Sequence, residues 1–192
     1  GDGQHDMAGY AAQLPLIHHP GEVFNYSSGT TNIISRIIGD AVGGDRDHME
    51  RFLHDRLFAP IGMSSAIPKF DAAGTFVGSS FVYATARDFS RFGQLYLNGG
   101  TWDGERILPA GWAEHAATWS ADDPGSAFAY GRHWWLWPDL PGVFGCHGYE
   151  GQYTLVAPDR DLVVVHLGKS PIEHRAPLLV ALRELISGVE QA

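Results

Sequence analysis

The 192-residue sequence has a single cysteine, only two lysines and no long apolar run. Cys146 alone cannot form an internal disulfide. No stretch reaches the roughly 18 to 20 apolar residues that a membrane-spanning helix requires, and the first 20 residues lack the basic start and apolar core of a signal peptide. The sequence therefore predicts a soluble chain without a membrane span.

Basic residues are also few, with 13 Lys and Arg against 22 Asp and Glu and a net charge of −9. Binding to phosphate groups needs a concentrated basic face, and no Lys/Arg cluster is present, so neither nucleic acid nor an anionic membrane is an expected partner. The ten histidines show no His-Glu-x-x-His spacing and there is no Cys-x-x-Cys pair. We therefore expect no metal site.

The first two thirds of the chain have helical patterns. Apolar residues recur at three- and four-residue spacing, and glycine or proline ends each run. The predicted helices cover residues 30–42, 47–58, 85–98 and 109–117. In the first of them, isoleucines and Ala41 line one face, and in the second Met49, Phe52, Leu53 and Leu57 point inward.

Strand patterns replace helical ones after Ala127. The predicted strands are residues 130–137, 153–157 and 162–167, and the turn residues 158–161 join the last two into a hairpin. Because "LVVVHL" is apolar at consecutive positions, we expect helices on both faces of the sheet, one of them at residues 178–186. The predicted fold class is α+β, with a mainly helical region at 1–126 and antiparallel strands plus a C-terminal helix at 127–192.

The stretch "PGEVFNYSSGTTNIISRIIGD" places Tyr26 and Ser28 at the start of the first predicted helix. A tyrosine in this position usually packs against the core with its hydroxyl at the surface. However, a helix N-terminus stabilises a nearby anion, so a phenol there is suited to act as a general base. Ser28 could hold a second catalytic group by a hydrogen bond.

A second candidate region is "FGCHGYEGQYTLV", where glycines stand at 145, 148 and 151 within a strand pattern. Such glycines allow another group to approach the backbone closely, as at an exposed strand edge beside a cleft. Backbone N–H groups of that edge could polarise a carbonyl oxygen. The alternative is a glycine-rich bend in a globular domain with only a structural role.

Four blocks in one order resemble the serine hydrolases of the β-lactamase and penicillin-binding-protein fold, especially the class C β-lactamase-related esterases and 6-aminohexanoate-dimer-hydrolase-like amidases. The blocks are "PGEVFNYSS", "LFAPIGM", "ATARDFSRFGQLYLNGGTWDGERILP" and "HGYEGQYTLVAPDRDLVVVHLG". The resemblance implies a β-lactamase/transpeptidase-like fold, an ester, amide or β-lactam substrate, and a bacterial cytoplasmic or periplasmic protein. The acyl transfer that it implies needs no metal and no organic cofactor.

The resemblance also assigns roles to individual residues. Tyr26, Ser27 and Ser28 match the family's Tyr-x-Asn motif with serine in third place, so Tyr26 would shuttle protons and Ser28 would orient the catalytic lysine. Cys146, His147 and Gly148 stand where the family has Lys-Thr-Gly or His-x-Gly. The N–H of Tyr149 would then be an oxyanion-hole donor, while the orientation of His147 relative to the substrate stays open.

The family's nucleophile lies in a Ser-x-x-Lys motif that this sequence lacks, because neither Lys69 nor Lys169 follows a serine at that spacing. We therefore expect the N-terminal part of the fold to be missing, both predicted regions to belong to one incomplete catalytic domain, and this chain alone to be inactive. Its expected partners are the missing N-terminal segment or another copy of itself. A non-catalytic penicillin-binding or sensor domain is the alternative function.

Overall fold

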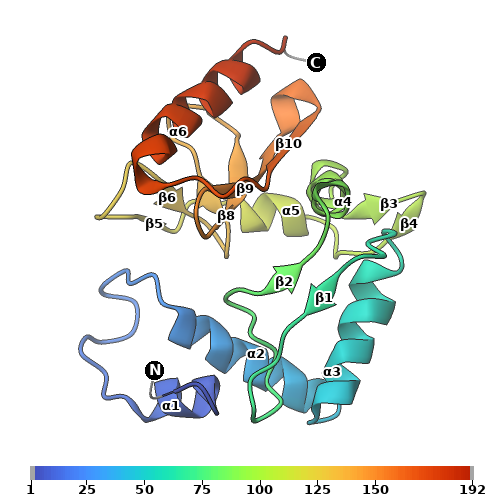
Figure 1. The fold of residues 1–192 in the computed structure, drawn as a ribbon, viewed down its shortest axis with the longest axis vertical. Coiled ribbons are helices and arrows are strands. Elements are labelled where there is room, and N and C mark those ends of the chain that lie inside the picture. The colour runs from blue at the N-terminus through green and yellow to red at the C-terminus, as the bar shows by residue number, and fades with distance from the viewer. Residues whose placement is uncertain (1–2, 191–192) are drawn as a thin grey trace. The chain divides into compact units, whose positions relative to one another are not determined.

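The computed structural model describes residues 3–190, which form two compact units divided between Thr85 and Ala86. Helices and antiparallel strands are both present, which confirms the predicted α+β class (Figure 1). The sequence patterns divided the chain after residue 126, between a helical and a strand-rich region. That these two regions belong to one catalytic domain remains a prediction.

Among the described residues, the first unit is built from three α-helices, a π-helical turn and a small two-stranded antiparallel sheet. Their bounds are α1 Met7–Gln13, α2 Ser28–Val42, α3 Arg46–Leu53, η1 His54–Phe58, β1 Ile67–Pro68 and β2 Val82–Tyr83. Both predicted helices in this unit are confirmed, but the second changes to π-helical hydrogen bonding at His54. Met49 and Phe58 are buried, whereas Phe52 lies at the surface, contrary to the prediction.

The second unit holds the main sheet. Its elements are α4 Ala86–Leu97, β3 Thr101–Trp102, β4 Glu105–Arg106, α5 Trp112–Ala116, β5 Ala121–Asp122, β6 Ala129–Tyr130, β7 Trp135–Leu136, β8 Phe144–Gly148, β9 Gln152–Ala157, η2 Pro158–Arg160, β10 Leu162–His166 and α6 Ile172–Ser187. Among the described residues, the sheet order is β10-β9-β8-β7-β6-β5, with every neighbouring pair antiparallel.

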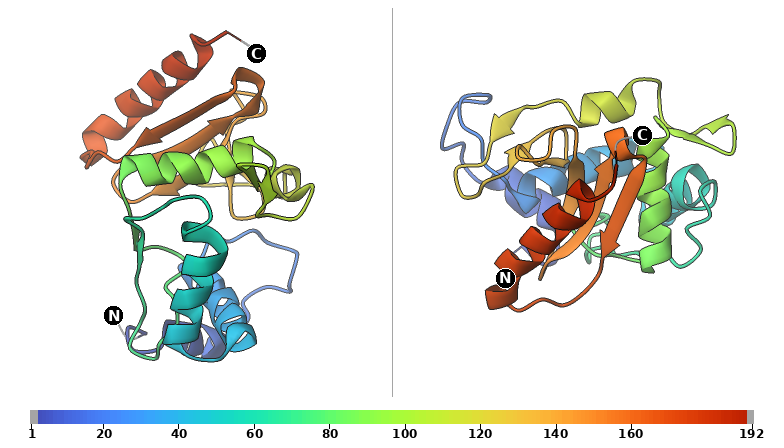
Figure 2. Two further views of the ribbon diagram at one scale, coloured as in Figure 1. Left: turned by 90° about the vertical axis from the view of Figure 1, so that its right-hand side faces the viewer. Right: turned by 90° about the horizontal axis from the view of Figure 1, so that it is seen from above.

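Helices cover both faces of the sheet at β9 and β10, as the continuous apolar strand predicted (Figure 2). Leu162 and Val164 pack toward the cluster that contains Leu182 and Ile186 of α6. On the opposite face, α4 approaches so closely that a Cβ on Gly93 would lie 2.6 Å from Val163 Cγ1. Glycine at position 93 therefore permits the contact between this helix and the sheet.

The predicted strand at residues 130–137 is wrong, because β6 and β7 form a hairpin instead. Tyr130 pairs with Trp135, and the Gly131 N–H donates to the Trp134 carbonyl at 2.8 Å. His133 adopts a φ of 63°, which closes the turn. A Cβ at Gly131 would lie 2.3 Å from the Ala116 carbonyl oxygen, so this turn also packs tightly against α5.

Candidate functional site

Tyr26 and Ser28 lie at the N-terminal end of α2. Ser27 has extended backbone angles and precedes the first helical residue, Ser28. The Tyr26 side chain is 52% exposed, and Ser28 is also exposed. Both residues therefore belong to the end of α2 whose N–H groups carry a partial positive charge, which stabilises a nearby anion.

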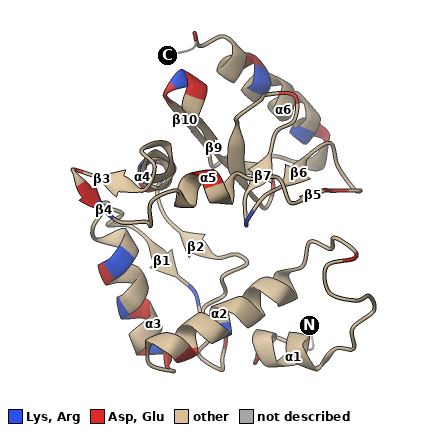
Figure 3. Ribbon diagram, turned by 180° about the vertical axis from the view of Figure 1, so that it is seen from behind, with Lys and Arg blue, Asp and Glu red and all other residues tan. Residues whose placement is uncertain are grey.

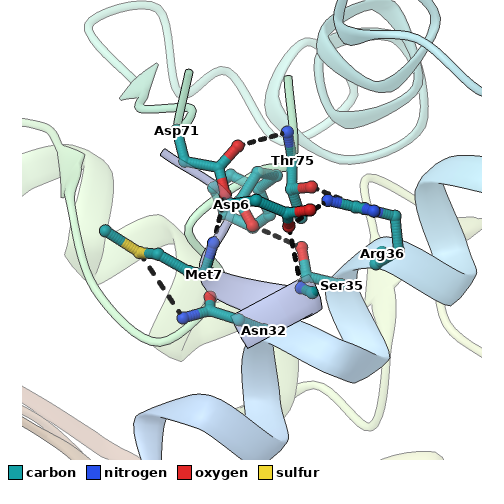
Figure 4. Close-up of polar contacts among 9 residues, drawn as sticks. Asp6, Met7, Asn32, Ser35, Arg36, Asp71 and Thr75 are labelled. Carbon is teal, nitrogen blue, oxygen red and sulfur yellow. Dashed lines mark hydrogen bonds and ion pairs between the residues drawn. The ribbon is translucent and has the colours of Figure 1, made fainter. Parts of the chain in front are cut away.

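A polar face fixes α2 within its unit (Figure 4). The Ser35 hydroxyl donates to the Phe76 carbonyl at 2.6 Å. The Arg36 guanidinium donates to the Asp6 carboxylate at 2.6 Å and to the Thr75 hydroxyl at 2.7 Å. Two segments that are distant in sequence, one at Asp6 and one at Thr75 and Phe76, thus hold one side of the helix that carries Tyr26 and Ser28 at its start.

The same network ties α1 to the loop that follows β1. Asp71 accepts from the backbone N–H groups of Met7 and Thr75, both at 2.9 Å (Figure 4). Asp6 caps α1 by accepting from the Gly9 N–H at 2.8 Å, and this bond, with Arg36, lowers the pKa of the Asp6 carboxyl. No sequence motif signalled this network, because its members are far apart along the chain.

The apolar face of α2 differs from the usual arrangement of an amphipathic helix. The buried residues of α2 are Asn32 and Ser35, whereas Ile34, Ile37 and Ile38 are exposed, with Ile37 62% accessible. The helical spacing correctly predicted one isoleucine-rich face. Tertiary contacts within the unit bury the polar face instead, because the hydrogen-bonding partners of Ser35 and Arg36 lie there.

The second group of candidate residues lies on β8 and the turn after it. Residues Phe144–Gly148 pair with β9 along their whole length. By contrast, β7 pairs only with Phe144 and Gly145, so within residues 3–190 the other edge of Cys146–Gly148 has no neighbouring strand. A strand edge of this kind is suited to pairing with a ligand or another strand.

Cys146 and His147 point to opposite faces of the sheet, as consecutive strand residues do. Cys146 packs against the cluster of Ala116, Trp134, Phe144 and Val156. Burial raises the pKa of its thiol to about 12, so the thiol stays protonated and is a poor nucleophile near neutral pH. A thiol is neutral or anionic, so Cys146 cannot provide the positive charge of the lysine in the Lys-Thr-Gly motif.

His147 lies in an aromatic box on the other face. The Trp137 indole N–H donates to His147 Nε2 at 3.0 Å, so the imidazole proton resides on Nδ1. Trp135 stacks on the imidazole at 5.2 Å, and Phe128 contacts it edge-on at 4.6 Å between ring centroids. Burial lowers the pKa of His147 to about 3, and the ring is therefore neutral over the physiological range.

Tyr149 stands on the turn between β8 and β9 with its side chain 80% exposed. Glu150 has a φ of 58°, an unusual conformation for a residue with a side chain. The turn is held because the Ser170 N–H donates to the Glu150 carbonyl and the His166 Nδ1–H donates to the Gly151 carbonyl, both at 2.8 Å. Sequence reasoning missed Ser170 and His166, which position this turn from β10 and the loop after it.

The two groups of candidate residues belong to different compact units, with Tyr26 and Ser28 in the first and Cys146–Tyr149 in the second. Across residues 3–190, no group of three or more His, Cys, Asp or Glu side chains is arranged to hold a metal ion. The helices within residues 3–190 are too short or too polar to span a lipid bilayer.

Comparisons with known proteins agree with the predicted fold. The beta-lactamase family profile matches residues 1–183. The 6-aminohexanoate-dimer hydrolase of Paenarthrobacter ureafaciens is 30% identical over 159 residues, which are 77% of this chain and 40% of that protein. A solved structure from Bacillus anthracis, described as a candidate 6-aminohexanoate-dimer hydrolase, is 27% identical with a TM-score of 0.80, covering 96% of this chain and 50% of its own.

A beta-lactamase structure from Mycobacterium bovis is 18% identical and has a TM-score of 0.68, with 97% of this chain and 74% of the other aligned, which supports the fold alone. The chain spans 40% of its curated hydrolase relative and half of the Bacillus anthracis structure. Together these matches confirm the β-lactamase/transpeptidase-like fold that the four sequence blocks predicted. The chain therefore belongs to the beta-lactamase family.

Proposed function

We propose that this chain is the C-terminal portion of a serine hydrolase that cleaves an ester, amide or β-lactam through an acyl-enzyme. The observation that carries the proposal is the Tyr26-Ser27-Ser28 sequence at the start of α2, in a chain whose residues 1–183 match the family. The name of the Paenarthrobacter relative favours a linear amide among these substrates.

In this proposal the nucleophilic serine and its lysine come from the part of the fold that the chain does not contain. The serine attacks the substrate carbonyl while the lysine and Tyr26 move its proton, and Ser28 orients the lysine. The Tyr149 N–H, held on its fixed turn, donates to the developing oxyanion. The C–O or C–N bond of the substrate then breaks and the proton passes to the expelled alcohol or amine, which leaves an acyl-serine ester. Water hydrolyses this ester, which releases the acid and restores the serine, and no step requires a metal or an organic cofactor.

His147 has a structural role in this scheme. A neutral imidazole that accepts from Trp137 and stacks on Trp135 holds the strand that leads to Gly148 and Tyr149. Its ring faces the aromatic cluster, and the neighbouring backbone is the part of β8 that we assign to substrate binding.

The chain alone is expected to be inactive, since it has no Ser-x-x-Lys motif. Incubation of the purified 192-residue chain with nitrocefin or a p-nitrophenyl ester should release no chromophore, whereas the longer protein should turn over an ester or amide. Burst release of p-nitrophenol stoichiometric with the chain would contradict the assignment. Stoichiometric β-lactam binding without turnover by the longer protein would instead support the penicillin-binding or sensor alternative.

Strand β10 is the proposed contact with the rest of the fold. It pairs with β9 on one side and is the edge of the sheet within the described residues. Leu162–His166 contains no Lys, Arg, Asp, Glu or Pro (Figure 3), although such residues commonly protect an edge from pairing with another chain. We propose that a strand from the remainder of the hydrolase pairs here, or that another copy of the chain does so in its absence.

This proposal predicts that the purified chain is not a lone monomer. One of two results is expected. Intact-mass spectrometry should detect a second polypeptide from the same hydrolase, or light scattering should give a multiple of the 20.9 kDa chain mass. The physical reason is the gain of backbone hydrogen bonds along an apolar strand edge. A stable monomer at 20.9 kDa with no second polypeptide would show that β10 needs no strand partner.

A further inference from the structure

A pocket of about 280 Å³ lies in the second unit, at the opposite end of β8 from the proposed substrate site. It is lined by residues around the start of β8, including Leu136, Pro141, Val143 and Phe144. The volume is close to the lower end of the roughly 300 to 1,000 Å³ range of small-molecule pockets. Nothing in the proposed hydrolytic mechanism uses this pocket.

The lining of the pocket offers a carboxylate but no unengaged side-chain hydrogen-bond donor. Its only side-chain donors are the indoles of Trp119 and Trp137, and both are already engaged, by Asp122 at 2.9 Å and by His147 at 3.0 Å respectively. The only ionisable side chain of the lining is the Asp122 carboxylate. A ligand carboxylate would find no side-chain donor and would face a like charge, whereas a cation would be attracted.

A second carboxylate and an exposed indole reinforce this preference. Asp159 is not part of the lining, but its carboxylate lies near a residue that is, since a Cβ built on Gly142 would lie 3.5 Å from Asp159 Oδ2. The Trp119 side chain is 60% exposed, yet its N–H bond to Asp122 fixes its orientation. An indole face attracts a cation through its π electrons, and Trp is the strongest aromatic partner for this interaction.

We propose that this pocket binds a small organic cation, an apolar body with an ammonium group. The body occupies the apolar lining at Leu136, Val143 and Phe144, and the ammonium lies at the rim beside Asp122 and the Trp119 ring. This site is separate from the candidate hydrolytic residues, and it does not depend on the chain belonging to an active enzyme.

The proposal is tested by titrating the 192-residue chain with n-hexylammonium, with 1-hexanol and hexanoate as probes of the same chain length. Tryptophan fluorescence and calorimetry should show saturable binding of n-hexylammonium, about tenfold or more tighter than that of 1-hexanol, because only the cation gains from the carboxylate and the indole. Hexanoate should not bind. Equal affinity for the three probes, or no saturable binding of n-hexylammonium, overturns the proposal.

Two variants locate the site. Asp122→Asn keeps the shape and an acceptor for the Trp119 N–H, and it should reduce n-hexylammonium affinity to about that of 1-hexanol because the charge is removed. Asp123→Asn is the matched control, since Asp123 caps the β5–β6 turn through Gly125 and Ser126 and does not line the pocket. The control should bind n-hexylammonium like the parent chain, and equal losses in both variants overturn the assignment to this pocket.

Discussion

Replacement of Tyr26 by phenylalanine in the longer hydrolase should lower kcat by about 10² to 10⁴, the usual contribution of a general acid or base. The phenol at the start of α2 is proposed to move the proton of the nucleophilic serine, and phenylalanine cannot carry a proton. Substrate binding should change less, so KM should stay within about threefold while kcat falls. Steady-state kinetics with a p-nitrophenyl ester would measure both constants.

The stability of the Tyr26→Phe variant separates chemistry from packing. The Tyr26 ring is about half exposed, so retaining the ring and removing the hydroxyl should leave the melting temperature nearly unchanged. Tyr83→Phe is a matched control, because it removes the hydroxyl of another exposed tyrosine in the same unit. Full turnover in Tyr26→Phe together with early melting would assign Tyr26 to packing.

Acid should destabilise the second unit through His147. The pKa of His147 is lowered from 6.5 to about 3 in the folded chain, chiefly by burial. The unfolded chain therefore takes up a proton at a higher pH than the folded chain does. The free energy of unfolding is therefore unaffected by this proton uptake above pH 6.5. It decreases as the pH falls toward 3, by a total of about 5 kcal/mol.

Between pH 6.5 and pH 4.5, the free energy of unfolding should fall by about 2 kcal/mol more in the parent chain than in the His147→Gln variant. Glutamine stays neutral and offers an oxygen that accepts the Trp137 N–H, so it removes the titration while keeping the acceptor. Denaturant unfolding followed by tryptophan fluorescence reports on this unit, because all six tryptophans lie after Thr85.

His174→Gln is the control for this measurement, since His174 is an exposed histidine on α6. It should lose stability with acid to the same extent as the parent chain. Parallel pH profiles for the parent and His147→Gln would mean that the imidazole is not kept neutral by its aromatic surroundings. The decrease expected from His147 is large relative to the total stability of a domain, which is only about 5 to 15 kcal/mol.

Local patterns in the sequence determined several elements. The stripe at residues 89–96 and the glycines after it correspond to α4, and the two apolar runs around residues 158–161 correspond to the β9–β10 hairpin. Consecutive apolar positions in β10 also predicted helices on both faces. These features depend on neighbouring residues, whose periodicity and turn preferences are visible in the sequence itself.

For the candidate site, the sequence showed which motifs are present but not how their side chains are arranged. The order Tyr26-Ser27-Ser28 followed much later by Cys146-His147-Gly148 pointed to the family. Alternation along β8 required Cys146 and His147 to face opposite ways, but it could not say which face holds the aromatic box. That choice depends on Trp135 and Trp137, which meet His147 only because the chain turns back at residues 131–134.

The tertiary structure alone decided which side of α2 is buried. A helical repeat of isoleucines shows that these side chains share a face, but burial requires a surface that covers them. In this unit the covering segments are α1 and the Asp71–Phe76 loop, and they offer carboxylate, hydroxyl and carbonyl partners to Ser35 and Arg36. Sequence patterns thus determined which residues share a face, whereas long-range contacts decided what each face meets, because hydrogen bonds and packing depend on residues far apart in the chain.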